Sequence, residues 1–216
     1  MAVPADTKQP RARGRPPRNA QQRAEQRARL LDGVMTAVRT HGTDVSIDEM
    51  AAQAGVSKPV LYDEFGDKQG IVDAVGVAMA ERFERELFAA VTTSPAIDLE
   101  TMVRVSIDGL MALIDAEPQL YRFLVRGLRS SDRGLLDNVL VGVLRDRAEV
   151  IVRFMAPNVD LDATAVLADG LFGFVFAAVE SWQVRRRPSR EELVEQIAAV
   201  LTQAFRTVAE SAPPLS

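Results

Sequence analysis

The sequence predicts an all-α protein in which a three-helix head is followed by a helical body, with about nine helices in total. Two observations lead to this fold class. Apolar residues recur at intervals of three and four along most of the 216 residues, and helix-breaking Pro and Gly residues separate these stretches. No stretch shows the alternation of apolar and polar residues that is typical of a half-buried strand.

Residues 1–18 form a basic arm that we expect to be disordered without a partner, because it has almost no large apolar side chain. Residues 1–29 carry a net charge of +6 and the whole chain carries −4, so the remaining residues carry −10. A basic end on an acidic body favours a polyanion bound at that end.

Residues 13–18 of this arm resemble the core of an AT-hook, whose arginines enter a narrow A·T-rich minor groove. The candidates for this contact are Arg13, Arg15 and Arg18. Alternatively, the arm adds only non-specific contacts to phosphates. Both interpretations favour DNA as the polyanion.

The head is expected over residues 19–67, and it begins with a helix that runs to about Thr40. Residues 46–65 then read as two short helices. Ser46 and Glu49 form a capping box, and Gly55 ends the first helix because it best adopts a left-handed conformation. Ser57 caps the second helix, and Pro59 lies in its first turn. Such a pair crosses steeply as a helix-turn-helix, which presents its second helix to the major groove of DNA.

The body is expected over residues 68–211, followed by a tail at 212–216. A long helix begins at about Lys68 and ends before Pro95. Further helices are expected over residues 98–116, 119–128, 135–154 and 160–187. A second capping box, formed by Ser189 and Glu192, opens the last helix.

Composition excludes several kinds of chemistry. The chain has no cysteine, and its one histidine, His41, lies at the end of a helix, where it suits a cap or surface role. We therefore expect no metal, no cofactor and no enzymatic activity. No apolar run approaches the roughly 20 residues of a membrane span, and the N-terminus lacks the apolar region of a secretory signal. We expect a cytoplasmic protein with no membrane contact.

Residues 54–62, Ala-Gly-Val-Ser-Lys-Pro-Val-Leu-Tyr, followed by Phe65 and Lys68, resemble the TetR family of bacterial transcriptional regulators. The specific match covers about residues 28–75, and the rest resembles the family only in architecture. The resemblance implies a homodimer whose heads bind a palindromic operator in double-stranded DNA, and whose bodies bind a small-molecule effector and dimerise. It places Lys58, Pro59 and Val60 at base edges, Tyr62 and Lys68 at phosphates, and Leu61 and Phe65 in the head core.

This sequence departs from the family pattern at Asp63 and Glu64, where aromatic or basic residues are common. Phosphates repel carboxylates, but an Asp or Glu can accept a hydrogen bond from the amino group of cytosine. We therefore predict fewer phosphate contacts from this helix, a base-reading role for Glu64, and greater dependence on the arginine arm. The two capping residues, Ser46 and Ser57, are further DNA-binding candidates.

The aromatic and methionine residues of the body have two interpretations. They pack a helical core, or they line a largely apolar ligand cavity between the helices of residues 98–128, 135–154 and 160–187. In the second case the expected effector is apolar or amphipathic, such as an acyl chain. The candidate lining residues are Met102, Met111, Tyr121, Phe123, Phe172, Phe174 and Phe176.

The last two helices are the expected dimer surface. Glycines at 170 and 173 permit close approach of a second helix, although they would also loosen the helix around a pocket. The candidate interface residues are Gly170, Gly173, Trp182, Leu193, Ile197 and Leu201.

The leading hypothesis is a repressor that an effector releases from its operator. Effector binding would tilt the long helix after Lys68 and change the separation of the two recognition helices. The alternative is a ligand-independent architectural protein that bends A·T-rich DNA with its arginine arm. An enzyme is disfavoured, because the body shows no recognisable catalytic constellation.

Overall fold

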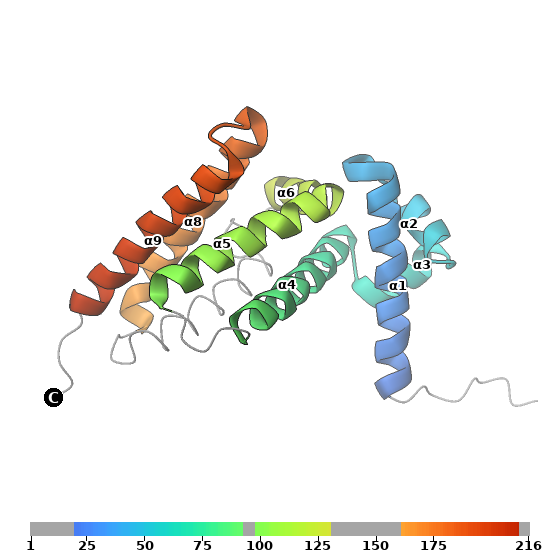
Figure 1. Ribbon diagram of the computed structural model, residues 1–216. Coiled ribbons are helices and arrows are strands. Elements are labelled where there is room, and N and C mark those ends of the chain that lie inside the picture. Colours follow the sequence, from blue (N-terminus) through green and yellow to red (C-terminus); the bar gives the residue numbers. More distant parts are fainter. Residues whose placement is uncertain (1–19, 93–97, 131–160, 212–216) are drawn as a thin grey trace, which may run out of the picture.

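The computed structural model describes residues 20–92, 98–130 and 161–211, and the regular elements in this part of the chain are helices (Figure 1). The head contains α1 (Ala20–His41), the short 3-10 helix η1 (Gly42–Asp44), α2 (Ile47–Gln53) and α3 (Lys58–Phe65). The body contains α4 (Lys68–Thr92), α5 (Leu99–Ala116), α6 (Pro118–Ser130), α8 (Leu161–Arg185) and α9 (Arg190–Ser211). The predicted all-α fold is confirmed. The helix expected over residues 135–154, the basic arm and the tail lie outside the described residues.

Both predicted capping boxes are present. At α2, Ser46 N donates to Glu49 Oε2 at 2.7 Å, and Glu49 N donates to Ser46 Oγ at 3.2 Å. The bond from Ser46 N, together with a second from Ser46 Oγ to Glu49 Oε2 at 2.7 Å, holds the pKa of the Glu49 carboxyl below its ordinary value. At α9, Ser189 N donates to Glu192 Oε2 at 2.9 Å, and Glu192 N donates to Ser189 Oγ at 3.2 Å. Local sequence therefore fixes where α2 and α9 begin, because each box satisfies amides that the first helical turn leaves without partners.

Glycine is required at two positions around the turn between α2 and α3. Gly55 has a φ of +69°, a left-handed conformation that a side chain disfavours. Gly33 of α1 lies against the turn, and a Cβ added there would be 2.5 Å from Ala54 Cα. The helix α1 therefore packs directly on the backbone of the turn.

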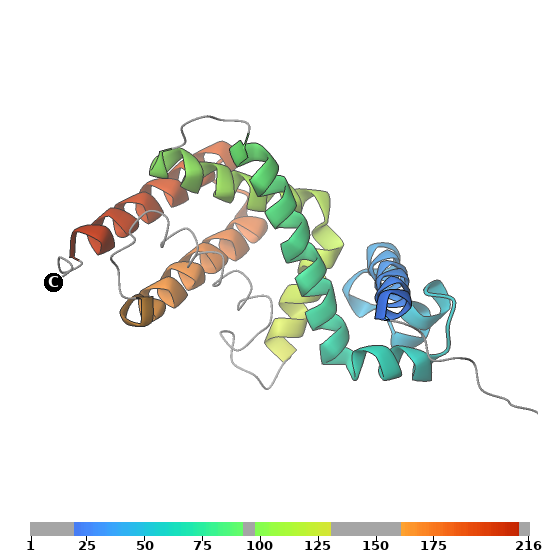
Figure 2. The same cartoon turned by 90° about the horizontal axis from the view of Figure 1, so that it is seen from below.

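One apolar core runs continuously from the head into the body. Figure 2 shows α4 leaving the head with α6 beside it, and α6 also contacts α1 and η1. The buried side chains of this first core include Val34, Val38, Met50, Leu61 and Phe65 from the head, and Ile71, Val75, Leu113, Leu120, Phe123 and Leu124 from the body. Packing against α4 and α6 therefore constrains the orientation of the head.

A second core holds α5, α8 and α9 together. Its buried members are Val103, Ile107, Met111, Ile114, Val179, Trp182, Leu193, Val194, Ile197, Ala198 and Leu201. Trp182 Nε1 donates to Pro188 O at 2.9 Å, and Arg190 Nη2 pairs with Asp108 Oδ1 at 2.9 Å. These contacts tie the end of α8 and the start of α9 to α5.

The second core contains four of the residues predicted for the dimer surface. Trp182, Leu193, Ile197 and Leu201 are at most 7% exposed and pack against helices of their own chain. Their helical spacing correctly indicated a buried face. Spacing carries no information about whether the covering helix comes from the same chain or from a partner.

The contact between Gly33 and the turn predicts a loss of stability on substitution. Gly33→Ala forces a methyl group against Ala54 and should lower the free energy of unfolding by about 1–3 kcal/mol, the usual cost of overpacking. The matched control is Gly109→Ala in α5, whose Cβ would meet Phe83 at an ordinary 3.6 Å. That variant should be neutral or up to about 1 kcal/mol more stable, because alanine favours helices. Urea unfolding of both variants measures this, and equal stabilities would contradict the packing described.

Candidate nucleic-acid interface and ligand cavity

Helix α3 has a buried face and an outer face. Leu61 and Phe65, one turn apart, are buried and attach α3 to the first core. Successive residues lie about 100° apart around a helix, so Pro59 and Asp63 fall on the opposite side, where both are exposed. Lys58 is exposed at the start of the helix, and Val60 and Tyr62 are half-buried at its edges. The outer face is the part of α3 that can enter a groove.

Glu64 is bound to the head rather than directed outward. Arg27 Nη1 of α1 donates to Glu64 Oε1 at 3.1 Å and to the Glu64 carbonyl oxygen at 2.9 Å. The same guanidinium lies 4.8 Å from the centre of the Phe65 ring. This geometry argues against the prediction that Glu64 reads a base, because its carboxylate already has a cationic partner. Asp63, by contrast, is exposed and forms no hydrogen bond or ion pair with any residue that the structure describes.

Two lysines lie at the starts of helices in the candidate interface. Lys58 Nζ is 3.5 Å from Asp48 Oδ2 in an exposed pair, which is a weak interaction that phosphate can displace. Lys68 is exposed at the first residue of α4. The three arginines predicted to enter the minor groove lie outside the described residues.

The two capping serines differ in how their hydroxyls are used. Ser46 Oγ donates to Glu49 Oε2 at 2.7 Å and accepts from Glu49 N, so the capping box occupies it. Ser57 caps α3 in an extended conformation, and its side chain makes no capping hydrogen bond. Ser57 is therefore the better placed of the two to bind a phosphate.

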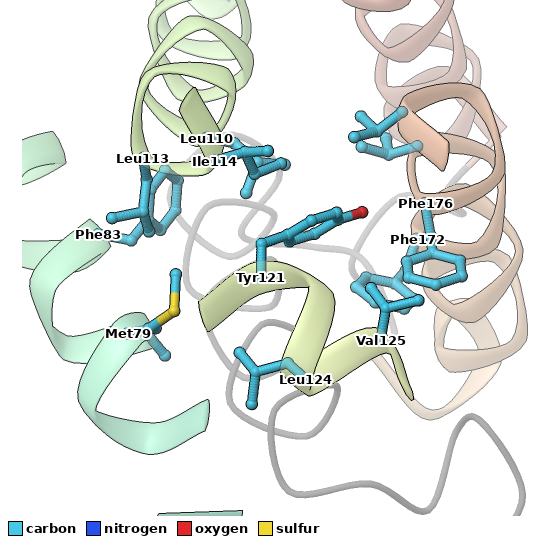
Figure 3. Close-up of a pocket in the computed structure, with 13 residues that line it drawn as sticks. Met79, Phe83, Leu110, Leu113, Ile114, Tyr121, Leu124, Val125, Phe172 and Phe176 are labelled. Atoms are coloured by element: carbon cyan, nitrogen blue, oxygen red, sulfur yellow. The ribbon is translucent and has the colours of Figure 1, made fainter. Parts of the chain in front are cut away.

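A cavity of about 80 Å³ lies between α4, α5, α6 and α8 (Figure 3). In Figure 3 the Tyr121 ring extends from α6 between the walls formed by α5 and α8. Tyr121 is the one polar residue among those described as lining it, and the others are Met79, Ala80, Phe83, Leu110, Leu113, Ile114, Leu124, Val125, Phe172, Val175, Phe176 and Val179. A site of this composition suits an apolar ligand.

The structure brings together only some of the predicted lining residues. Tyr121, Phe172 and Phe176 line the cavity. Met102, Met111, Phe123 and Phe174 do not: Met111 and Phe123 are buried in the second and first cores, Phe174 is 39% exposed, and Met102 is half-buried elsewhere on α5.

The sequence placed the cavity between the helices of residues 98–128, 135–154 and 160–187, and that prediction missed the wall formed by α4. Met79 and Phe83 are one helical turn apart and both line the cavity. Their spacing was a usable signal for a buried face. It did not show that the same helix serves both the head core and the cavity.

The hydroxyl group of Tyr121 has a defined partner. Tyr121 Oη donates to Glu180 Oε1 of α8 at 2.8 Å. Across the cavity, the Phe172 and Phe176 rings are stacked with centroids 6.2 Å apart. The hydrogen bond lets a tyrosine contribute apolar ring surface to the wall while its polar group remains satisfied.

A cluster of charged side chains joins the head to the body beside this cavity. Arg39 of α1 donates twice to Glu117, from Nε to Oε2 at 2.9 Å and from Nη2 to Oε1 at 3.0 Å. Arg82 of α4 donates from Nη1 to Glu117 Oε1 at 2.8 Å and from Nε to Glu86 Oε1 at 2.8 Å. The Glu117 side chain is only 13% exposed.

Mutual hydrogen bonding shifts the titration of these groups. The bonds from Arg39, followed by the charge of Arg82, hold the pKa of the Glu117 carboxyl below its ordinary value. The bond to Glu117 raises the pKa of Arg39, and the bond to Glu86 is the main cause that raises the pKa of Arg82. The pKa of Glu117 is lower in the folded protein than in the unfolded chain, where it is roughly 4.3. The ionised carboxylate therefore stabilises the fold fully above that unfolded pKa, and this contribution is lost as the pH falls through the folded pKa. The cluster is therefore fully charged near neutral pH.

Two other kinds of site were sought in the described residues. They contain no group of three or more His, Cys, Asp or Glu residues arranged to hold a metal ion. Among the helices over the same residues, none is both long and apolar enough to cross a membrane.

Comparisons with known proteins agree with this architecture. Residues 30–75 match the bacterial regulatory proteins of the tetR family, and residues 87–214 match the tetracyclin repressor-like C-terminal domain. An uncharacterised HTH-type transcriptional regulator of Mycobacterium tuberculosis is 29% identical over 201 residues, which cover 92% of this chain and 85% of that protein.

Solved structures share the fold at lower identity. FadR from Bacillus subtilis in complex with stearoyl-CoA is 16% identical, with a TM-score of 0.60 and 81% of this chain and 97% of that chain covered. RolR in complex with resorcinol is 20% identical, with a TM-score of 0.63 and 92% and 100% covered. With both its head and its body matched, the chain belongs to the TetR family of helix-turn-helix transcriptional regulators, a family of DNA-binding proteins that are not enzymes.

Proposed function

We propose that this regulator is a cytoplasmic repressor that binds a palindromic operator as a homodimer, and that an apolar small molecule in the cavity releases it. The observation that supports the effector class is the lining, in which Tyr121 is the one polar residue described. A charged or strongly polar ligand would lose its hydration there with little compensation, which is unfavourable. An apolar ligand gains about 25 cal/mol for each Å² of apolar surface that it buries.

The fold alone does not select the ligand. Structures with this fold hold molecules as different as stearoyl-CoA and resorcinol. The cavity of about 80 Å³ is also smaller than the roughly 300–1,000 Å³ typical of sites for drug-sized ligands. A long acyl chain would therefore have to extend through the opening of the cavity or push the walls apart, whereas a compact apolar molecule needs less movement.

For the dimer we propose the outer face of α8 and α9. Apart from the adjoining residues and the backbone of α8 itself, no described atom lies within 4 Å of the positions where Gly170 and Gly173 would carry a Cβ. On the same two helices, Phe174 is 39% exposed and Val200 is 49% exposed. Exposed apolar side chains beside glycines favour close packing of a second helix.

The dimer proposal predicts the mass in solution. Light scattering coupled to size exclusion should give twice the chain mass of 23.6 kDa for the wild type. Phe174→Glu should shift the mass to that of a monomer, because a carboxylate in an apolar interface loses its hydration. Ala112→Glu, on the exposed side of α5, should leave the dimer intact. A dimeric Phe174→Glu variant would place the interface elsewhere.

The geometry of α3 predicts different outcomes for its two acidic residues. An operator is first selected from random DNA duplexes with the wild-type protein. Asp63→Ala should then relax the preference at one base pair of each half-site, where a specific contact is worth about 1–3 kcal/mol. Glu64→Ala should weaken binding to all sequences to a similar extent, because it releases Arg27 from α3. If Glu64→Ala changed the base preference and Asp63→Ala did not, Glu64 rather than Asp63 would be the residue that reads a base.

The cavity predicts which molecules act as effectors. N-phenyl-1-naphthylamine, a neutral fluorescent probe, should bind the wild type with a rise in fluorescence and weaken its binding to the selected operator. Leu110→Trp should abolish probe binding by filling the cavity, and Ala112→Trp, two residues away on the exposed side of α5, should not. If Leu110→Trp bound the probe as tightly as the wild type, this cavity would be excluded as the probe site. If the probe strengthened operator binding, the protein would be a corepressed regulator.

A further inference from the structure

Helix α6 lies between the cavity and the head. Tyr121, Leu124 and Val125 line the cavity from one side of α6. From another side, Phe123 is buried in the first core, and Arg126 Nη1 pairs with Asp44 of η1. Figure 1 shows α6 beside the C-terminal end of α1. Movement of α6 therefore cannot leave both the cavity wall and the head contacts unchanged.

The charged cluster lies where the cavity walls meet the head. Glu117 directly precedes α6, three residues after Ile114 and four residues before Tyr121, both of which line the cavity. Arg82 lies on α4 between Met79 and Phe83, which also line it. Each of these charged groups is therefore attached to backbone that the cavity contents would displace.

The third member, Arg39, belongs to the head. It contacts Glu117 through two hydrogen bonds in a bidentate arrangement, which fixes angle as well as distance. Exposed ion pairs contribute little, but Glu117 is 13% exposed and binds two arginines. The pair therefore restrains the angle between α1 and the start of α6.

The cavity has a volume of about 80 Å³ and is partly open. A larger ligand that fills it presses on the walls, and packed helices have few voids into which they can relax. The ends of α5 and α6 next to Glu117 form part of those walls. A displacement there reaches Arg39 without passing along the full length of α4.

We propose that Arg39, Glu117 and Arg82 are positioning residues that set the angle of the DNA-binding head and transmit occupancy of the cavity to it. This inference rests on the proposed function, because it takes the cavity as the effector site. It differs from a tilt of α4 alone, since the restraint on the head runs through the junction of α5 and α6. The matched control pair is Glu100 with Arg206, 3.7 Å apart, which joins α5 to α9 within the body.

The test measures head angle and ligand response separately. The chain has no cysteine, so cysteines introduced at the exposed Gln53 of α2 and Ala112 of α5 can carry two spin labels. An excess of unlabelled protein ensures that the measured distances lie within one chain. Glu117→Gln and Arg39→Gln should each broaden the distribution of head-to-body distances, and Glu100→Gln should not. The double variant Arg39→Gln/Glu117→Gln should have a distance distribution as broad as that of either single variant, because each single substitution already removes the same Arg39–Glu117 interaction. Thermal unfolding verifies that each variant is folded.

The response to ligand is measured with the same variants without labels. N-phenyl-1-naphthylamine should lower operator affinity about fivefold or more in the wild type and in Glu100→Gln, within the usual range of allosteric coupling. The probe should bind Glu117→Gln as tightly as the wild type, measured by fluorescence, but should lower the operator affinity of this variant by less than about twofold. If Glu117 only stabilised the fold, Glu117→Gln would not bind the probe normally while losing the effect of the probe on operator affinity.

Two results would overturn the proposal: distance distributions as narrow as that of the wild type, or an undiminished effect of the probe on operator binding in Glu117→Gln and Arg39→Gln. If the probe does not bind the wild type, the proposed effector site fails instead. The distance distributions without ligand then decide the positioning role, since broadening supports it and unchanged distributions exclude it.

Discussion

The packing of α6 against α4 is the contact on which the rest of the structure depends. A Cβ at Gly127 would lie 2.6 Å from Val72 Cγ1, so the backbone of α6 rests directly on α4. This close approach lets Phe123 enter the head core while Tyr121, on the same helix, lines the cavity. Head and body consequently share a continuous interior, and the position of one constrains the other.

Charge is distributed in a way that suits a DNA-binding head with an acidic recognition helix. Arg27 partners Glu64 within the head, which leaves Asp63 as the acidic residue on the outer face of α3. Exposed Lys58 and Lys68 supply positive charge at the starts of two helices, where backbone amides also favour phosphate. Residues 1–29, which comprise the basic arm and the start of α1, carry a net charge of +6 and favour attraction to phosphate that does not depend on DNA sequence.

Local patterns predicted local structure well and long-range contacts poorly. The capping boxes at Ser46 and Ser189, and the all-α fold, follow from short-range chemistry that the sequence displays directly. Helical spacing shows that a side chain is buried, but it does not identify what buries it. For this reason the spacing indicated burial of Tyr121, Phe123 and Trp182 alike, although Tyr121 lines the cavity and the other two are buried in the first and second cores. The pairing of Arg27 with Glu64 spans 37 residues and had no signal in the sequence.

The central claim is that the contents of the cavity determine whether two heads fit one operator. A single spin label at Gln53, one on each protomer, reports the separation of the two heads directly. We predict one separation for the DNA-bound dimer, compatible with half-sites about 34–36 Å apart. Saturation with N-phenyl-1-naphthylamine should change the separation of the heads in the DNA-free dimer to a value that differs from that of the DNA-bound dimer. An unchanged separation in a protein that demonstrably holds the probe would contradict the account.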